Sequence, residues 1–294
     1  MLVSAALAFT SCGTTDDTSD GSGDENQQVT SVGVRLSAPG LVSGIDPAHV
    51  SGIEVDLAAT LAQRLGVIDR PDDITWVRAD ASSAAEELDD GEMELLIGQF
   101  DQSELSEDIA WVGPYATVEA GLLVRNESPE DTDETDDYIA TETVASLADV
   151  HTSSVCVVAG SLADGAELPA AEVTTQQTVT ECETGMRSGR YDAIAADDLQ
   201  LAGVLADAPL PTSYDLLLWS ELADDDTDLD EQLLASGEYW LGTTAKQCES
   251  ASAALAELIE EGEVEELFGQ RDETTSFQPQ LIEADEVTTK YCDE

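Results

Sequence analysis

Two successive runs of alternating strand and helix patterns constrain the fold of this chain most strongly. In the first run the expected elements are a strand at 34–36, a helix at 52–66, a strand at 73–79, a helix at 82–92 and a strand at 93–100. In the second run they are a helix at 146–150, a strand at 154–160, a helix at 180–189, a strand at 191–198 and a helix at 199–206. Alternation of this kind predicts α/β architecture with open sheets.

Individual elements show clear apolar periodicity. The helix at 52–66 ends at Gly66 and has an apolar stripe with a spacing of four: Ile53, Leu57, Leu61 and Leu65. The next helix is expected to start at Ser82 or Ser83, and the strand at 93–100 is apolar enough for burial on both faces. Near the end of the chain, a strand at 238–244 leads into one amphipathic helix at 248–268.

The length of the chain favours two lobes or domains. It has 294 residues, of which 42% are hydrophobic, enough to fill two moderate cores. Between the two runs, the acidic segment Glu127–Asp137 has no apolar periodicity and fits a loop or a lobe boundary. We therefore expect one α/β lobe on each side of this segment.

The charge of the chain is strongly skewed toward acids. There are 64 Asp and Glu residues against 10 Lys and Arg, and the net charge of −54 excludes most nucleic-acid partners. A disordered acidic chain and a folded protein adapted to salt both explain this composition, and the periodicity from Val34 onward favours the folded protein. At about 1 M salt the Debye length is about 3 Å, so surface carboxylates no longer repel one another over distance.

The N-terminus carries features of a lipoprotein signal. An apolar run with small residues precedes Cys12, and the stretch Phe9-Thr10-Ser11-Cys12 resembles a bacterial lipobox, in which the cysteine is lipidated after cleavage. We predict a signal peptide over 1–12 and a disordered acidic tether over 13–30. The alternative is a core helix that ends in a free cysteine. No later segment has the roughly 20 apolar residues that a membrane span needs.

The remaining cysteines favour disulfides over metal binding. Cys12 aside, four remain, and an even number outside the cytoplasm predicts two disulfides. No two of them form a C-x2-C pair, and His49 and His151 are distant in sequence, so we expect no metal and no other cofactor. The chain also lacks a G-x-S-x-G elbow, an H-E-x-x-H motif and a P-loop, so we expect it not to be an enzyme.

Four motifs, in their order and spacing, carry a resemblance to a known family. They are SGIEVDLAATLAQRLG at 51–66, WVGPYATVEAGLLVR at 111–125, VCVVAGSLA at 155–163 and GRYDAIAADDLQLAG at 189–203. With these motifs the chain resembles the polar-amino-acid solute-binding proteins of ABC importers, of the glutamate/glutamine type. The resemblance covers residues from Gly33 to about Phe268, nearly the whole mature chain.

The resemblance implies a periplasmic-binding-protein-like (Venus flytrap) fold of type II, with ligand bound between two α/β lobes. Lobe 1 would comprise 31–122 and 241–294, and lobe 2 would comprise 123–240, joined by crossing strands at about 121–125 and 238–243. A monomer of this kind binds a small polar solute outside the cytoplasm and presents it to an ABC transporter permease. The family also implies a disulfide between Cys156 and Cys182, which leaves Cys248 and Cys292 for the second.

The resemblance also implies a ligand site built from residues of both lobes: Ser37, Gly98, Phe100, Asp101, Ser161 and Asp197. Asp197 lies where the family places the carboxylate that holds the α-ammonium of the ligand, and a buried carboxylate needs a cationic partner. Ser161 follows Gly160 at a strand-to-helix turn, where a hydroxyl and free N–H groups can hold an anion. The plainer alternatives are a solvated acid beside Asp198 and an N-cap serine.

The chain departs from the family at the group that binds the ligand carboxylate. Leu105 occupies the position of the arginine whose planar fork grips the α-carboxylate, and Ala84 lies near the place of a second basic residue. Ser37 stands where many relatives have an acid. The clamp of the family is therefore missing, although the fold motifs are present.

Three interpretations of the missing clamp stay open. The protein binds an amine or other small cation through Asp197 and Asp101, with Phe100 as a cation–π wall. Alternatively it binds an amino acid, with hydroxyls, backbone N–H groups, Arg35 or Arg78 in place of the clamp. In the third interpretation it is a ligand-sensing or scaffold lipoprotein that has lost transport.

Overall fold

The computed structural model describes residues 30–101, 105–125, 144, 146–207, 214–223, 229–269 and 279–292. The predicted signal peptide with Cys12, nearly all of the predicted tether and the acidic segment Glu127–Asp137 lie outside this part of the chain. Within it, none of the helices combines the length and the apolar character needed to cross a membrane.

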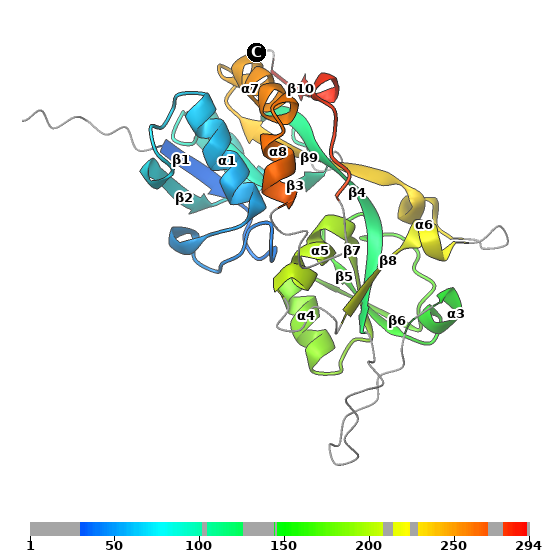
Figure 1. Ribbon diagram of the computed structural model, residues 1–294. Helices are drawn as coiled ribbons and strands as arrows, with labels where there is room; N and C mark the ends of the chain where they lie inside the picture. Colours follow the sequence, from blue (N-terminus) through cyan, green and yellow to red (C-terminus); the bar gives the residue numbers. More distant parts are fainter. Residues whose placement is uncertain are drawn as a thin grey trace, which may run out of the picture.

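The first lobe is built on a sheet in the order β2-β1-β3-β9-β4, with β10 also paired to β4 (Figure 1). Its strands are β1 (Thr30–Val34), β2 (Ile74–Arg78), β3 (Leu95–Asp101), β4 (Ala110–Arg125), β9 (Ser236–Thr243) and β10 (Thr288–Lys290). Its helices are α1 (Ile53–Arg64), α2 (Ala81–Asp89), α7 (Cys248–Glu260) and α8 (Glu263–Gly269). Strand β1 pairs in parallel with β2 and β3, as alternating strands and helices require.

The second lobe has the same kind of construction. Its strands are β5 (Ser154–Val158), β6 (Glu172–Gln176), β7 (Ala193–Asp197) and β8 (Tyr214–Leu218), and its helices are α3 (Leu147–Val150), α4 (Val179–Arg187), α5 (Asp198–Asp207) and α6 (Trp219–Leu222). Strand β5 pairs in parallel with β6 and β7. Four 3-10 helices complete the described elements, at Pro47–His49, Pro71–Asp73, Glu231–Leu234 and Ala284–Glu286.

Strand β4 belongs to both lobes and joins them. Residues 110–112 and 116–119 pair with β9, whereas residues 120–125 pair with β7 and β8. The two strands cross between the lobes where residues 116–119 pair with residues 236–239. The first crossing therefore lies a few residues before the expected 121–125, because those residues already pair within the second lobe. The fold class predicted from the sequence, two α/β lobes with two crossing strands, is confirmed; the lobe boundaries stay a prediction.

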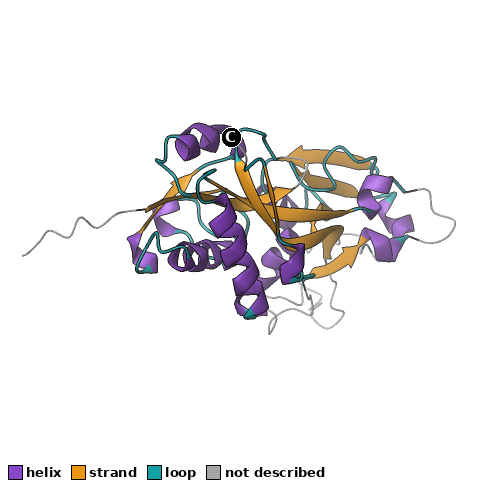
Figure 2. Cartoon of the chain, turned by 90° about the horizontal axis from the view of Figure 1, so that it is seen from above, coloured by secondary structure: helices purple, strands orange, loops and turns teal. Residues whose placement is uncertain are grey.

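Apolar residues fill a separate core in each lobe. In the first lobe, the stripe of α1 packs with α7 and α8 over the sheet, and an aromatic cluster lies beneath α2 with three large members: Phe100, Trp111 and Trp240. In the second lobe, the apolar residues form one cluster around β5 and Trp219 and another around α4 and α5. Seen from above, strands run through the middle of the molecule and helices lie at both of its ends (Figure 2).

Two local predictions were wrong in detail. The helix predicted over 248–268 is broken into α7 and α8 at Gly262, whose positive φ of 77° is the left-handed conformation that ends helices. Helix α2 has Asp80 as its N-cap, and the Asp80 carboxylate accepts hydrogen bonds from the backbone N–H groups of Ser82 and Ser83 at 3.0 and 3.1 Å. The helix thus starts at Ala81, one to two residues before the expected serines, with an aspartate as its N-cap.

Candidate functional site

A buried carboxylate lies where the two lobes meet. Asp197 ends β7 of the second lobe, and its side chain is 1% exposed. One carboxylate oxygen, Oδ1, accepts a hydrogen bond from the Leu162 N–H at 2.8 Å, and Oδ2 accepts one from the Tyr239 hydroxyl at 2.6 Å. Tyr239 is on β9 and packs in the core of the first lobe. Groups from both lobes therefore orient this carboxylate.

Local sequence explains the position of Asp197. Strand β7 has the sequence AIAAD and is buried along its whole length, so its last residue is carried to the carboxyl end of the sheet. Helix α5 begins at the next residue, Asp198. Open α/β sheets bind ligands at this edge, beyond the carboxyl ends of their strands. Asp197 thus occupies the edge that the resemblance assigns to the ligand.

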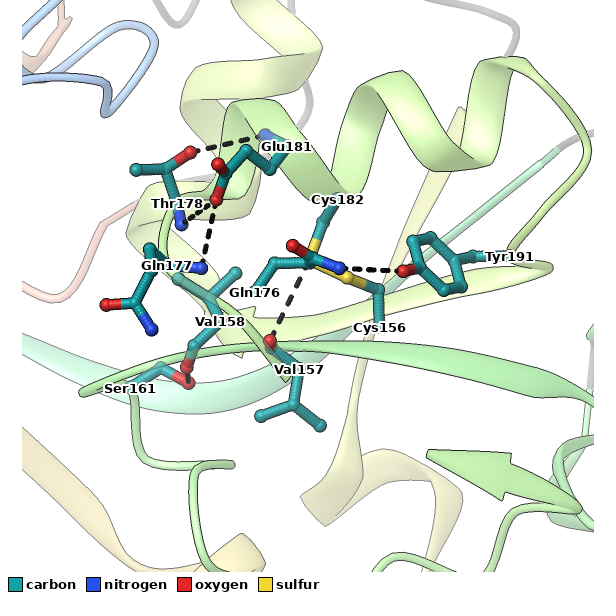
Figure 3. The surroundings of a disulfide bond; sticks show 10 residues. All are labelled: Cys156, Val157, Val158, Ser161, Gln176, Gln177, Thr178, Glu181, Cys182 and Tyr191. Carbon is teal, nitrogen blue, oxygen red and sulfur yellow. Dashed lines mark hydrogen bonds between the residues drawn. A yellow bond between two sulfur atoms is a disulfide. The ribbon is translucent and has the colours of Figure 1, made fainter. Parts of the chain in front are cut away.

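The turn after β5 supplies the donor from Leu162. Ser161 is 6% exposed, and both its N–H and its hydroxyl donate to the carbonyl of Val158, at 3.2 and 2.7 Å. Figure 3 shows this turn beside the disulfide between Cys156 on β5 and Cys182 on α4. The hydroxyl of Ser161 thus stabilises the turn that contains it. The same turn directs the N–H of the next residue, Leu162, toward Asp197.

Both disulfides predicted from the sequence are present. The Cα atoms of Cys156 and Cys182 are 5.6 Å apart, and those of Cys248 and Cys292 are 5.9 Å apart, both within the usual range. The first links a strand to a helix behind the site, and the second links the start of α7 to the end of the chain. Among the residues that the structure describes, no group of three or more metal-ligating side chains is arranged to hold an ion.

A second acid, Asp198, lies next to Asp197 but in a different environment. Burial raises the pKa of Asp198 to about 7, and the negative charges of Asp197 and Glu119 add to this effect. Hydrogen bonds from the backbone N–H groups of Leu199, at 2.7 Å, and Glu119 oppose the shift of the pKa. Burial thus favours the protonated form of Asp198 more than it would for a solvent-exposed acid.

Helix α5 lies between the two lobes. Leu199 packs in the core of the first lobe, whereas Leu201 and Val204 pack in the core of the second. A Cβ atom on Gly203 would lie 1.8 Å from the carbonyl oxygen of Pro39, so glycine permits backbone contact between the lobes here. The two lobes therefore touch along α5 in this structure.

In the first lobe, Arg35, which follows β1, lies beside the second half of β3. Gly98 has a φ of 144°, and a Cβ atom there would lie 2.5 Å from the Cβ of Arg35. The Arg35 guanidinium carbon lies 4.2 Å from the ring centroid of Phe100. Asp101 accepts a hydrogen bond from the Glu238 N–H at 3.3 Å. A protein cation, Arg35, thus lies over the ring that we predicted to act as a cation–π wall.

Ser37 and Leu105 are the other residues that the sequence analysis named in the first lobe. The backbone carbonyl of Ser37 accepts a hydrogen bond from the Thr180 hydroxyl at 3.4 Å, which is a further contact between the lobes. Leu105 is half-buried and packs on the aromatic cluster that includes Phe100 and Trp111. The direct roles of Ser37, Gly98, Phe100, Asp101, Ser161 and Asp197 in ligand binding stay predictions.

Three buried polar residues near the site were missed by the sequence analysis. Glu54 on α1 is 0% exposed and accepts hydrogen bonds from the Gln99 N–H at 3.2 Å and the Tyr115 hydroxyl at 2.5 Å. The sequence carried one signal for it, because Glu54 precedes Ala58 by four residues and Leu61 by seven, on the buried face of the helix. The sequence carried no such signal for Tyr115 and Tyr239, because each has the pattern of an ordinary apolar residue in a strand.

Two α/β lobes joined by crossing strands, with a buried carboxylate between them, define a protein of the periplasmic-binding-protein class. The model of the bacterial extracellular solute-binding proteins, family 3, matches residues 31–270, and the chain belongs to this family. The resemblance inferred from the motifs is thereby confirmed at the level of the family. A search of the curated proteins found no matching sequence.

Solved structures share the fold at low sequence identity. The solute receptor for L-cysteine of Neisseria gonorrhoeae is 16% identical over 84% of this chain and 90% of its own, with a TM-score of 0.58. An ancestral arginine-binding protein bound to arginine is 18% identical over 83% and 97%, with a TM-score of 0.54. The ancestral amino acid-binding protein AncCDT-1, a precursor of cyclohexadienyl dehydratase, is 17% identical over 83% and 96%, with a TM-score of 0.57.

Family membership bears on the prediction that the chain is not an enzyme. The family is one of solute-binding proteins, which suggests a binding role, although the ancestral protein AncCDT-1 precedes an enzyme. Members of a family of extracellular solute-binding proteins typically act outside the cytoplasm, as the signal-like N-terminus predicts.

Proposed function

We propose that this protein binds an amino acid between its lobes and delivers it to the permease of an ABC importer. The observation that carries the proposal is the carboxylate of Asp197, which is 1% exposed, lies at the carboxyl end of β7 and is held by donors from both lobes. Each carboxylate oxygen has two lone pairs, so Asp197 can accept further hydrogen bonds from an ammonium group. A ligand ammonium would also balance the buried negative charge.

Arg35 is the residue that we propose in place of the missing carboxylate clamp. It directly follows β1 at the edge of the sheet where ligands bind, and its guanidinium lies over Phe100, in the same aromatic cluster on which Leu105 packs. Arg78, the other candidate, ends β2 and is exposed to solvent. A guanidinium can grip a carboxylate with two parallel hydrogen bonds, so Arg35 supports an amino acid over a simple amine.

A solute screen in high salt tests this proposal. Amino acids and their decarboxylated amines are compared by thermal shift, and the hits are measured by isothermal titration. An α-amino acid should bind at least tenfold more tightly than its matched amine. Equal binding of the two, or tighter binding of the amine, would contradict the amino-acid proposal.

The variant Leu105→Arg distinguishes the same two solute classes, amino acids and amines, by a change in the protein and not in the solute. This variant places a guanidinium at the position that the family uses for its clamp. If the solute carries a carboxylate, affinity should stay the same or rise, because a second cationic partner becomes available. If the solute is an amine, affinity should fall, because the new charge repels it.

We further propose that the mature protein is anchored to the membrane by lipid on Cys12. The lipobox-like stretch and the following polar segment support the anchor. More than one acyl chain is needed for stable anchoring, since a single chain gives only reversible binding. Cys12→Ala should release the protein into the medium or block its processing, and unchanged retention of this variant in membranes would argue against lipidation.

A further inference from the structure

A buried acid on α1 is connected to the proposed ligand clamp through one residue of β3, Gln99. The Glu54 carboxylate accepts the Gln99 N–H, and the side-chain amide of Gln99 donates to the same carboxylate. Gln99 has a φ of 54°, a left-handed conformation that is uncommon for residues other than glycine. The two hydrogen bonds that Gln99 donates to Glu54 thus hold Gln99 in a conformation that it would rarely adopt by itself.

The opposite side of Gln99 contacts Arg35. The Gln99 carbonyl accepts a hydrogen bond from Nη1 of Arg35 at 3.3 Å, and the same guanidinium lies over the ring of Phe100. Among the contacts of Arg35, the hydrogen bond to the Gln99 carbonyl and the packing on the Phe100 ring help to set the direction of this long side chain. The polar contact exists only while the backbone of Gln99 keeps its conformation.

We propose that Glu54 is a positioning residue for the solute carboxylate: it holds Gln99 so that the Gln99 carbonyl orients the guanidinium of Arg35 toward the site. This inference rests on the proposed role of Arg35 in binding an amino acid. Glu54 itself is 0% exposed and is covered by Tyr115 and Gln99, so it acts through other residues and not by touching the solute.

The alternative is that Glu54 only stabilises the first lobe. A purely structural acid would, on substitution, lower stability and weaken the binding of all solutes alike. A positioning acid would instead change the ratio between solutes that have a carboxylate and solutes that lack one. The ratio of affinities is therefore the measurement that separates the two roles.

The first experiment compares wild type with Glu54→Gln by isothermal titration of L-arginine and agmatine, and of L-cysteine and cysteamine. Gln has nearly the same size as Glu, but its amide cannot accept at both positions. We expect the preference for the amino acid over its amine to fall at least tenfold in Glu54→Gln. Glu183→Gln, which alters a buried acid of α4 in the second lobe, is the matched control and should keep the ratio.

The second experiment needs no solute. It therefore tests the inference even if none of the four compounds binds, a result that would count against them as solutes of this protein. The guanidinium protons of Arg35 lie over the face of Phe100, so ring currents should shift their NMR signals, which are assigned by their loss in Arg35→Lys. In Glu54→Gln these signals should move toward ordinary values, while in Glu183→Gln they should not. An unchanged Arg35 signal, or an unchanged affinity ratio, in folded Glu54→Gln would overturn the inference.

Discussion

The hydroxyl of Tyr239 lies 2.6 Å from Oδ2 of Asp197, and this hydrogen bond joins crossing strand β9 to the end of strand β7 in the second lobe. Tyr239 packs in the core of the first lobe, and its ring lies 6.1 Å from that of Tyr115 on the other crossing strand. The proposed ammonium anchor is therefore fixed directly to the connection between the lobes. A solute bound at Asp197 would therefore contact a residue that is hydrogen-bonded to a strand joining the lobes, which is where hinge motion takes place in proteins that close around a ligand.

Tyr239→Phe should lower the free energy of unfolding by about 1–3 kcal/mol, because a buried carboxylate loses a charge-assisted donor. Chemical unfolding in high salt measures the change. Tyr191→Phe is the control, since the Tyr191 hydroxyl accepts a neutral hydrogen bond from the Gln176 amide at 3.0 Å and should cost less. Equal losses in the two variants would show that the contact with Asp197 has no special weight.

Asp197→Asn should weaken the binding of an amino acid by roughly 2 kcal/mol or more, because the ammonium loses its charged partner in a desolvated site. Asp198→Asn is a close control. Its carboxylate accepts hydrogen bonds from backbone N–H groups, so affinity should change little. Isothermal titration of both variants decides, and wild-type affinity in Asp197→Asn would remove this residue from the site.

The elements that the sequence predicted correctly are those with local signals. The stripe from Ile53 to Leu65 defines α1, and the apolar run before Gly98 defines β3, because the partner surfaces of both are simply apolar. Asp197 could be placed at the end of a strand for the same reason: a run of small apolar residues leads into it. Local pattern and tertiary position agree at these sites.

The hydrogen bonds that build the site could not be predicted from local sequence patterns. Leu162 and Asp197 are 35 residues apart and meet within the second lobe, whereas Tyr239 and Asp197 are 42 residues apart and meet between the lobes, so both pairings depend on tertiary packing. The left-handed conformation of Gln99 likewise has no sequence signal, because it is held by Glu54 from a distant helix. Long-range hydrogen bonds of this kind follow from tertiary structure and not from periodicity.

Gly203→Ala should hinder closure of the lobes without destabilising them. The added Cβ would lie 1.8 Å from the carbonyl oxygen of Pro39, across the boundary between the lobes. Within the helix itself, alanine is favoured over glycine by about 1 kcal/mol. We expect weaker solute binding and a larger radius of gyration by small-angle X-ray scattering, with a melting temperature that is unchanged or higher.

Gly185→Ala provides the comparison for that variant. Its Cβ would lie 2.3 Å from the ring of Tyr191, inside the second lobe, so this change should lower stability. A compact Gly203→Ala protein with full affinity would show that the lobes need not approach so closely.

Stability should rise with salt concentration. The net charge of −54 makes repulsion between carboxylates the dominant electrostatic effect, and salt screens it. Salt also weakens attractive pairs such as Arg64 with Glu261 at 2.6 Å, but an exposed pair contributes only about 0–1 kcal/mol. The midpoint of thermal unfolding should therefore climb from dilute buffer to molar NaCl, and a flat or falling midpoint would contradict adaptation to salt.

Glu54 should make the protein less stable as the pH rises through neutrality. Burial raises the pKa of Glu54 from 4.5 to about 7, against the opposing effects of its hydrogen bonds with Tyr115 and Gln99 and of the charge of Arg35. Between these two pH values the folded protein binds more protons at this site than the unfolded chain. The contribution of Glu54 to stability is therefore fully present below about pH 4.5 and is lost as the pH rises through 7.

Glu54→Gln isolates this effect, because the other acids titrate alike in both proteins and cancel in the difference. The free energy of unfolding of wild type minus that of Glu54→Gln should fall between pH 4.5 and pH 8, by an amount on the order of a few kcal/mol. Urea unfolding at constant high salt across this range gives the difference at each pH. A difference that is flat or that rises with pH would mean that the Glu54 carboxylate is stabilised as an anion, with Arg35 and the hydrogen bonds outweighing burial.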